Sequence, residues 1–319
     1  MLRSPFPRSF RPRAVLGALC AAVFILLGAT ACQSVDGWQR GLIYRPSAQL
    51  ERTPDNAGLS YQDVWIDTPA AGSFKDGKVH GWWMPAREAD APALLFLHGN
   101  AGNMGYNLGI VERLATLGYS VLAIDYRGFG RSSPGVPDEP ALYADAQAAW
   151  KELARLAPQA SRRVIYGHSL GGAVAIDLAS RVPDAGALIV ESSFTSMADM
   201  AEVRGYGWLP VSFILTQHFS SRDKIAKVSV PTLFIHGERD GMVPVAMSQQ
   251  LFELAKGPKE LLIVPGARHA NAGMVAGEQW RHAIQQVSTN STLTAAIPAL
   301  PLGTVPAAPL PAATSTGGN

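Results

Sequence analysis

The segment Arg163 to Gly172, RVIYGHSLGG, constrains the possible fold of this chain more than any other. A β-branched and aromatic run that ends at Tyr166 meets the pentapeptide GHSLG, and small residues with a helical pattern follow at once. This order predicts a strand, a sharp turn and a helix. In a G-x-S-x-G turn the serine, here Ser169, takes a strained conformation, so its neighbours must be very small. An ordinary loop is the alternative, because glycine and serine are also common turn residues.

Apolar runs that alternate with helical stretches predict an α/β fold class for most of the chain. We expect strands at residues 61–67, 78–84, 93–98, 120–125, 163–166, 187–191, 232–237 and 261–264, and helices at residues 107–117, 139–156, 169–182, 245–254 and 273–287. The first two strands are predicted to pair as an antiparallel hairpin. The alternation that follows predicts a mostly parallel sheet with helices on both faces. In such sheets ligands lie beyond the carboxyl ends of the strands.

Residues 1–31 have the pattern of an export signal. Arginines precede an apolar run at residues 14–28, and the small residues Ala29-Thr30-Ala31 follow it as a cleavage site. A plain cleaved signal and an uncleaved anchor helix are both compatible with this pattern, although 18 apolar or small residues are marginal for spanning a bilayer.

The cysteine that follows this signal favours a third interpretation. Cys20 would leave with the signal, so Cys32 would be the only cysteine of the exported protein and could form no internal disulfide. The run AVFILLGATAC resembles a bacterial lipoprotein signal, and this resemblance implies that Cys32 is lipidated. Gln33 behind it resembles the pattern of outer-membrane sorting. We therefore expect a lipid-anchored protein of the bacterial cell envelope, held to the outer membrane on its periplasmic face.

The remaining chain divides by composition into a domain with flanking segments. Residues 33–58 hold few periodic apolar positions and are predicted to be a tether, and residues 59–287 are predicted to be the folded domain. Residues 192–230 interrupt the alternation and are predicted to form a small cap over the strand ends; a packed connecting helix is the alternative. Residues 288–319, rich in Ala, Pro and Thr, are predicted to be disordered.

The charge balance gives no reason to expect a nucleic-acid partner. The net charge of +2 comes from the arginines that precede Ala14, and the chain without them has 23 basic and 25 acidic residues. Such a chain lacks the positive field that binds phosphate backbones. Nothing in the sequence predicts an oligomeric state.

Two polar residues later in the chain complete a possible catalytic set with Ser169. A serine hydroxyl needs a base, and the base needs an orienting acid. Asp240 follows the strand predicted at 232–237, and His269 follows the strand predicted at 261–264. The order Ser, Asp, His is the one expected on this architecture. We predict Ser169 as nucleophile, His269 as base and Asp240 as acid, with Glu191 as the alternative acid.

Acyl transfer also needs hydrogen-bond donors for the negative oxygen that forms on attack. The glycine-rich turn after the strand at 93–98 places the backbone N–H of Asn100 as one donor, and the N–H of Leu170 is the other. No G-x-x-x-x-G-K-[ST] phosphate loop, paired Cys/His spacing or H-E-x-x-H motif is present. We therefore predict no cofactor and no metal.

As a set, these motifs resemble the α/β-hydrolase superfamily over roughly residues 60–287. The matching blocks are LLFLHGNAGN (94–103), DYRGFGRSS (125–133), GHSLGG (167–172), ESSFTS (191–196), HGERDGMVP (236–244) and GARHAN (266–271). They are similar to the serine aminopeptidase-like, or α/β-hydrolase domain-containing, branch. The resemblance implies the roles given above for Ser169, His269, Asp240, Asn100 and Leu170.

The predicted function follows from this site and from the resemblance. We expect a serine hydrolase that cleaves a carboxylic ester or thioester of a small-molecule acyl substrate through an acyl-enzyme. A serine peptidase with the same triad is one alternative, because function lies in the site and not in the fold. A non-catalytic envelope binding protein is the other.

Overall fold

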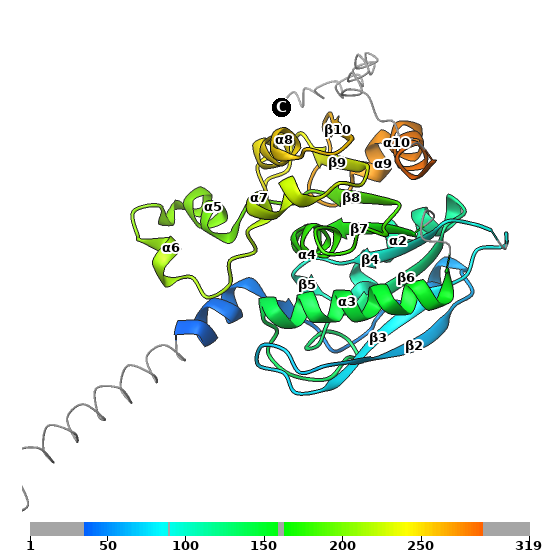
Figure 1. Cartoon of the computed structure of the whole chain (residues 1–319), viewed down its shortest axis with the longest axis horizontal. Helices are drawn as coiled ribbons and strands as arrows, with labels where there is room; N and C mark the ends of the chain where they lie inside the picture. The colour runs from blue at the N-terminus through cyan, green and yellow to red at the C-terminus, as the bar shows by residue number, and fades with distance from the viewer. Residues whose placement is uncertain (1–34, 89, 159–162, 290–319) are drawn as a thin grey trace, which may run out of the picture.

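The computed structural model describes residues 35–88, 90–158 and 163–289 (Figure 1). The predicted signal at residues 1–31, Cys32 and residues 290–319 of the predicted tail lie outside these ranges. Within the described residues, no helix combines the length and the apolar character needed to cross a membrane.

An eight-stranded sheet forms the centre of the domain, in the order β10-β9-β8-β7-β4-β6-β3-β2. The strands are β2 (Gln62–Thr68), β3 (Gly77–Met84), β4 (Ala93–Leu97), β6 (Ser120–Asp125), β7 (Arg163–His168), β8 (Ala187–Glu191), β9 (Thr232–Gly237) and β10 (Lys259–Val264). β2 and β3 form the predicted antiparallel hairpin, β3 also pairs antiparallel with β6, and every other pairing is parallel. The predicted α/β-hydrolase type of sheet is therefore confirmed.

Helices cover both faces of this sheet. The longer ones are α2 (Leu108–Thr116), α3 (Glu139–Leu156), α4 (Leu170–Ala179), α8 (Val245–Leu254) and α10 (Glu278–Thr289), and the shorter ones are η2 (Met104–Asn107) and α9 (Ala272–Ala276). Helices α3, α4 and α8 pack with one apolar cluster, and α2, α9 and α10 pack with another. Figure 1 shows α3 and α4 crossing in front of the strands.

The strands supply both clusters because their side chains alternate between the two faces. Leu95 and Leu97 of β4 belong to the cluster under α3 and α4, whereas Leu94 and Phe96 belong to the opposite one. All five residues of β4 are buried. A strand that is buried on both faces reads as a continuous apolar run, which is how the sequence identified it.

The last predicted helix, at residues 273–287, is two helices in the structure. Gly277 separates α9 from α10 with a φ of +50°, a value that side chains with a Cβ rarely adopt. Helix α10 then continues through Ser288 and Thr289, which we had predicted to lie in the disordered tail. Its apolar face, including Trp280 and Ile284, holds it on the sheet.

The structure differs from the tether predicted at residues 33–58. Residues 35–43 are helical, β1 (Arg45–Pro46) pairs in parallel with β5 (Ala101–Gly102), and η1 (Pro54–Ala57) follows. Tyr44 is buried and donates its hydroxyl to Gln217 at 2.9 Å. Hydrogen bonds rather than an apolar repeat attach this segment, so hydrophobic periodicity did not reveal it.

The segment predicted as a cap, residues 192–230, has two parts. The first contains α5 (Met197–Ala201), the π-helix η4 (Glu202–Tyr206) and α6 (Val211–Ile214), which project from the body in Figure 1. The second contains α7 (Ser221–Lys224) and η5 (Ile225–Lys227), and its Phe219 and Ile225 are fully buried in the main core. The alternative of one packed connecting helix does not fit, because the helices are short and the first part is largely exposed.

Candidate active site

Ser169 stands on the sharp turn between β7 and α4. Its φ of 56° and ψ of −121° lie outside the regions that residues with a Cβ prefer. The turn requires glycine on both sides: a Cβ on Gly167 would lie 2.2 Å from the Gly171 carbonyl oxygen, and one on Gly171 would lie 2.0 Å from the Leu97 carbonyl oxygen. The strand, turn and helix predicted from the sequence are therefore present, with the serine in the strained position.

The structure brings Ser169, His269 and Asp240 together from three separate strand ends. His269 Nδ1 lies 2.7 Å from Asp240 Oδ2, and its Nε2 lies 3.0 Å from Ser169 Oγ. A carboxylate can only accept, so Nδ1 carries the proton and Nε2 is left to accept from the serine hydroxyl. This is the arrangement in which an imidazole can remove a proton from a serine.

Asp240 is held in place by more than the histidine. The backbone N–H groups of Met242 and Val243 donate to its Oδ1 at 2.8 and 3.0 Å, and His236 Nε2 lies 3.2 Å from its Oδ2. Burial by itself raises the pKa of Asp240, but hydrogen bonds from His236, His269 and Val243 outweigh it and hold this pKa well below its usual range. The carboxylate is therefore ionised and fixed in orientation.

Glu191, the alternative acid, does not occupy this place. Its carboxylate accepts from the Tyr166 hydroxyl, and it is 1% exposed. Burial raises the pKa of Glu191, and the Tyr166 bond lowers it by less. Its backbone carbonyl accepts from Ser169 N–H at 2.9 Å, so Glu191 supports the turn rather than the base.

The two predicted oxyanion donors lie on either side of Ser169. Leu170 is the first residue of α4, where backbone N–H groups have no partner within the helix. A Cβ on Gly99 would lie 3.2 Å from the Ser169 Cβ, which places the Asn100 turn against the serine. The Asn100 side chain donates to the Ile43 carbonyl at 2.6 Å, away from the role predicted for its backbone N–H, which stays a prediction.

His168 is a supporting residue; its place next to Ser169 on the turn predicts a structural rather than a catalytic role, but not the partner that it bonds. Its buried ring lies 5.1 Å from the His269 ring, and its Nε2 lies 3.0 Å from the His269 carbonyl oxygen. A carbonyl accepts, so His168 donates and holds the loop that carries His269. This bond joins residues 101 positions apart, and no sequence spacing marks it.

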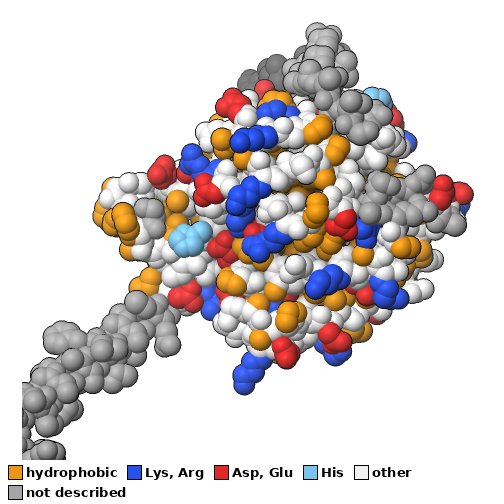
Figure 2. All heavy atoms as spheres, in the orientation of Figure 1, with side chains coloured by type: hydrophobic (Ala, Val, Ile, Leu, Met, Phe, Trp, Pro, Cys, Tyr) orange, Lys and Arg blue, Asp and Glu red, His pale blue; other side chains and the backbone are white. Residues whose placement is uncertain are grey.

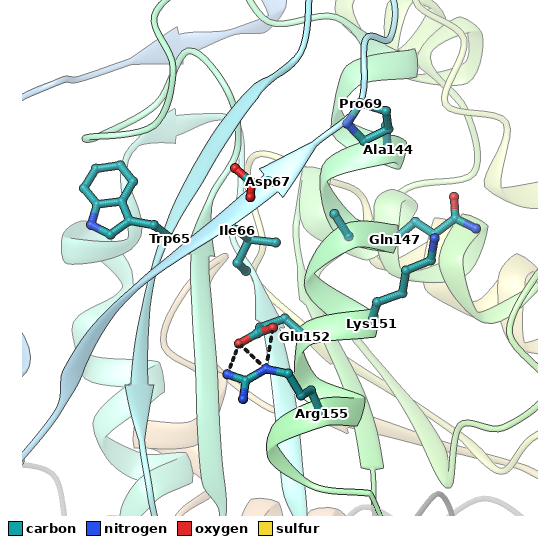
Figure 3. A pocket seen from close by; sticks show the side chains of 10 residues that line it. Trp65, Ile66, Asp67, Pro69, Ala144, Gln147, Lys151, Glu152 and Arg155 are labelled. Carbon is teal, nitrogen blue, oxygen red and sulfur yellow. Dashed lines mark hydrogen bonds and ion pairs between the residues drawn. The ribbon is translucent and has the colours of Figure 1, made fainter.

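Two further observations concern metal ligands and grooves in the described part of the chain. Within the described ranges, no group of three or more His, Cys, Asp or Glu side chains is placed to hold a metal ion. A groove between β2 and α3 lies at the far edge of the sheet from β9 and β10, and none of the triad residues lines it (Figure 3). Glu152 and Arg155 pair with each other along its wall.

Comparison with known proteins agrees with this geometry. Residues 89–222 match the serine aminopeptidase family. An uncharacterised protein of Mycobacterium tuberculosis is 36% identical over 275 residues, which cover 85% of this chain and 95% of that one. An α/β-hydrolase domain-containing protein of Arabidopsis thaliana is 32% identical over 274 residues, which cover 78% of this chain and 87% of that one. A solved esterase of Pyrococcus furiosus shares the fold, with a TM-score of 0.62 and 24% identity. The match covers 77% of this chain and 96% of the esterase. The chain therefore belongs to the α/β-hydrolase superfamily, and its class is that of the serine hydrolases.

The buried His168 generates a prediction about stability and pH. Burial, followed by the charge of His269, lowers the pKa of His168 from 6.5 to about 4. Between these values the unfolded chain binds a proton that the folded chain does not, so the free energy of unfolding falls as the pH falls from about 6.5 to about 4. We expect this group to account for about 3 kcal/mol of that fall.

Urea unfolding of wild type and His168→Gln across this pH range measures the effect. At neutral pH the free energy of unfolding of His168→Gln should be lower than that of wild type. It should also change less with pH than that of wild type. His218→Gln, which removes an exposed imidazole, is the control. If the free energy of unfolding changes with pH equally in wild type and in His168→Gln, the lowered pKa of His168 is contradicted.

Proposed function

We propose that this chain hydrolyses a carboxylic ester or thioester through an acyl-enzyme, with Ser169 as nucleophile. The observation that carries the proposal is the continuous hydrogen-bonded chain from Ser169 Oγ through His269 to the ionised Asp240. A binding protein on this fold would not need such a chain of contacts, nor the strained serine that begins it.

The contacts support a definite sequence of steps. His269 Nε2 takes the hydroxyl proton while Ser169 Oγ attacks the acyl carbonyl carbon. The negative oxygen that forms accepts from the N–H groups of Asn100 and Leu170, and each such donor contributes about 3 kcal/mol in other hydrolases. His269 then protonates the departing alcohol or thiol. A water molecule then gives a proton to His269 and attacks the acyl carbon. The bond to Ser169 Oγ breaks, His269 returns the proton to this oxygen, and the acid leaves.

Ester or thioester hydrolysis is favoured over peptide hydrolysis by the surroundings of the site. The projecting segment near the strand ends carries no charged residue between Arg204 and His218, which suits an acyl chain better than a charged peptide. An aminopeptidase needs an acid that holds the substrate amine. In this segment Asp199 pairs with Arg222 at 3.2 Å, which leaves Glu202 as the candidate. The match to the serine aminopeptidase family keeps this second candidate open to test.

Labelling with a fluorophosphonate probe tests the nucleophile. Wild type should react, and Ser169→Ala should lose both the label and at least about 10³-fold of its activity towards p-nitrophenyl esters. Ser193→Ala removes a second buried serine beside α4 and should keep both. Labelling that survives Ser169→Ala would overturn the proposal. Faster cleavage of aminoacyl anilides than of esters would favour the peptidase.

The acid is tested by a matched pair of amide substitutions. Asp240→Asn removes the charge that orients His269 and should lower kcat by about 10⁴-fold. Glu191→Gln keeps a group that can bond to Tyr166 and should change kcat by less than about tenfold. The reverse order of effects would assign the acid to Glu191.

We also propose that the chain is lipid-anchored in a bacterial envelope through Cys32. Support comes from the signal pattern and from the absence of a second cysteine after residue 31. In a bacterium fed labelled palmitate, wild type should incorporate the label and Cys32→Ala should not. Cys20→Ala is the control and should still be labelled. Label retained by Cys32→Ala would exclude lipidation at this residue.

A further inference from the structure

The helix at residues 35–43 presents its apolar side to solvent. Val35, Trp38 and Leu42 share one face by helical spacing, and they are 42%, 64% and 52% exposed. Gln39, which borders this stripe, is buried and bonds to the protein. A surface helix ordinarily turns its apolar stripe towards the core, so this orientation is reversed.

The projecting segment at α5, η4 and α6 exposes a second set of large apolar side chains. Val203, Tyr206, Trp208, Phe213 and Ile214 are 51%, 51%, 79%, 89% and 44% exposed. No charged residue lies between Arg204 and His218. Aromatic side chains this exposed are uncommon on a surface that contacts only water.

The two sets belong to one end of the molecule. Gln39 Nε2 donates to the Ile214 carbonyl at 2.7 Å, and Gln39 Oε1 accepts from Thr216 N–H at 2.9 Å. Figure 2 shows hydrophobic side chains gathered at the end that carries α5 and α6. The apolar end face is defined by its eight exposed members: Val35, Trp38, Leu42, Val203, Tyr206, Trp208, Phe213 and Ile214.

We propose that the apolar end face docks onto the surface of a lipid bilayer. Only three residues' length separates Cys32 from Val35, and this spans at most about 11 Å. The lipid proposed on Cys32 would therefore hold this face at the membrane. Trp and Tyr concentrate where hydrocarbon meets water, because one part of each ring system is apolar and the other is polar.

Docking rests in part on the lipid anchor proposed at Cys32, and its consequence for the active site rests on the proposed hydrolase function. Arg204 of η4 donates to the carbonyl of Met242, in the loop that fixes Asp240. Met242 is 49% exposed. A bilayer that contacts η4 therefore lies beside the triad, which suits an acyl substrate taken from the membrane rather than from solution.

The test uses the unlipidated chain that begins at Cys32, which contains the whole sheet, both core clusters and the site. It is mixed with vesicles of phosphatidylethanolamine and phosphatidylglycerol, and binding is measured by flotation. We expect wild type to bind, and the double variant Trp208→Gln/Phe213→Gln to show a vesicle partition coefficient at least about tenfold lower. Trp38→Gln should lower it by about threefold or more. Raising NaCl to about 0.5 M should change wild-type binding by less than about twofold, because the eight side chains that define the face carry no charge.

Trp65→Gln is the matched control. Trp65 is 50% exposed, lies on the edge strand β2 and does not belong to the apolar end face. The variant should bind vesicles as wild type does. Fluorophosphonate labelling of Ser169 without vesicles reports on the hydrolase separately, so failure of either proposal can be told from failure of the other. Three results would overturn docking: no binding by wild type, equal binding by the double variant, or loss of binding in salt. A wild-type dimer that the double variant converts to monomers, with no vesicle binding, would assign the face to self-association.

Discussion

The strained backbone at Ser169 is the constraint on which the rest of the site depends. A residue with a Cβ holds a positive φ only where its surroundings leave no other choice. Here α4 approaches Gly167 of β7, and the end of β4 approaches Gly171 of α4, too closely for a side chain at either glycine. The core on both sides of the sheet is what holds these elements together. Burial of the sheet thus stabilises a conformation that the turn alone would not adopt, and the result is a serine hydroxyl at the end of a buried strand, 3.0 Å from His269 Nε2.

A second close approach brings the base to the acid. A Cβ on Gly237 would lie 2.6 Å from the carbonyl oxygens of Ala267 and Arg268, so only glycine lets the loop after β9 reach the loop after β10. Arg239 N–H then donates to the Ala267 carbonyl at 2.8 Å. This contact is what allows Asp240 and the His269 loop to meet. Because β9 and β10 are parallel, the two loops lie at the same end of the sheet. The absence of a side chain at Gly237 then lets the loops come into contact.

What could be predicted from the sequence depends on whether the information is local. The bounds of α3 agree with the prediction because periodicity and the Asp138 N-cap both lie in the sequence itself. Ser169, Asp240 and His269 could be proposed because each follows a strand and their order is informative. The bond from His168 to the His269 loop could not be predicted, since it depends on a fold that joins distant residues. Contact of Ile43 and Tyr44 with the domain could be predicted from their apolar character. The regular structure of residues 35–58 could not, because isolated apolar contacts and hydrogen bonds leave no hydrophobic period.

The attachment of this N-terminal segment links the membrane side of the molecule to the proposed oxyanion turn. Arg45 N–H donates to the Asn100 carbonyl at 2.9 Å, and Asn100 donates its side-chain amide to the Ile43 carbonyl. The peptide units around Asn100 are therefore fixed by the same segment whose helix carries Trp38 on its outer side. A flexible tether would leave the site free to take any orientation to a bilayer. A segment that pairs with the turn beside Ser169 fixes the site relative to the helix, so an apolar helix face at the membrane also sets the direction from which a substrate can reach the serine.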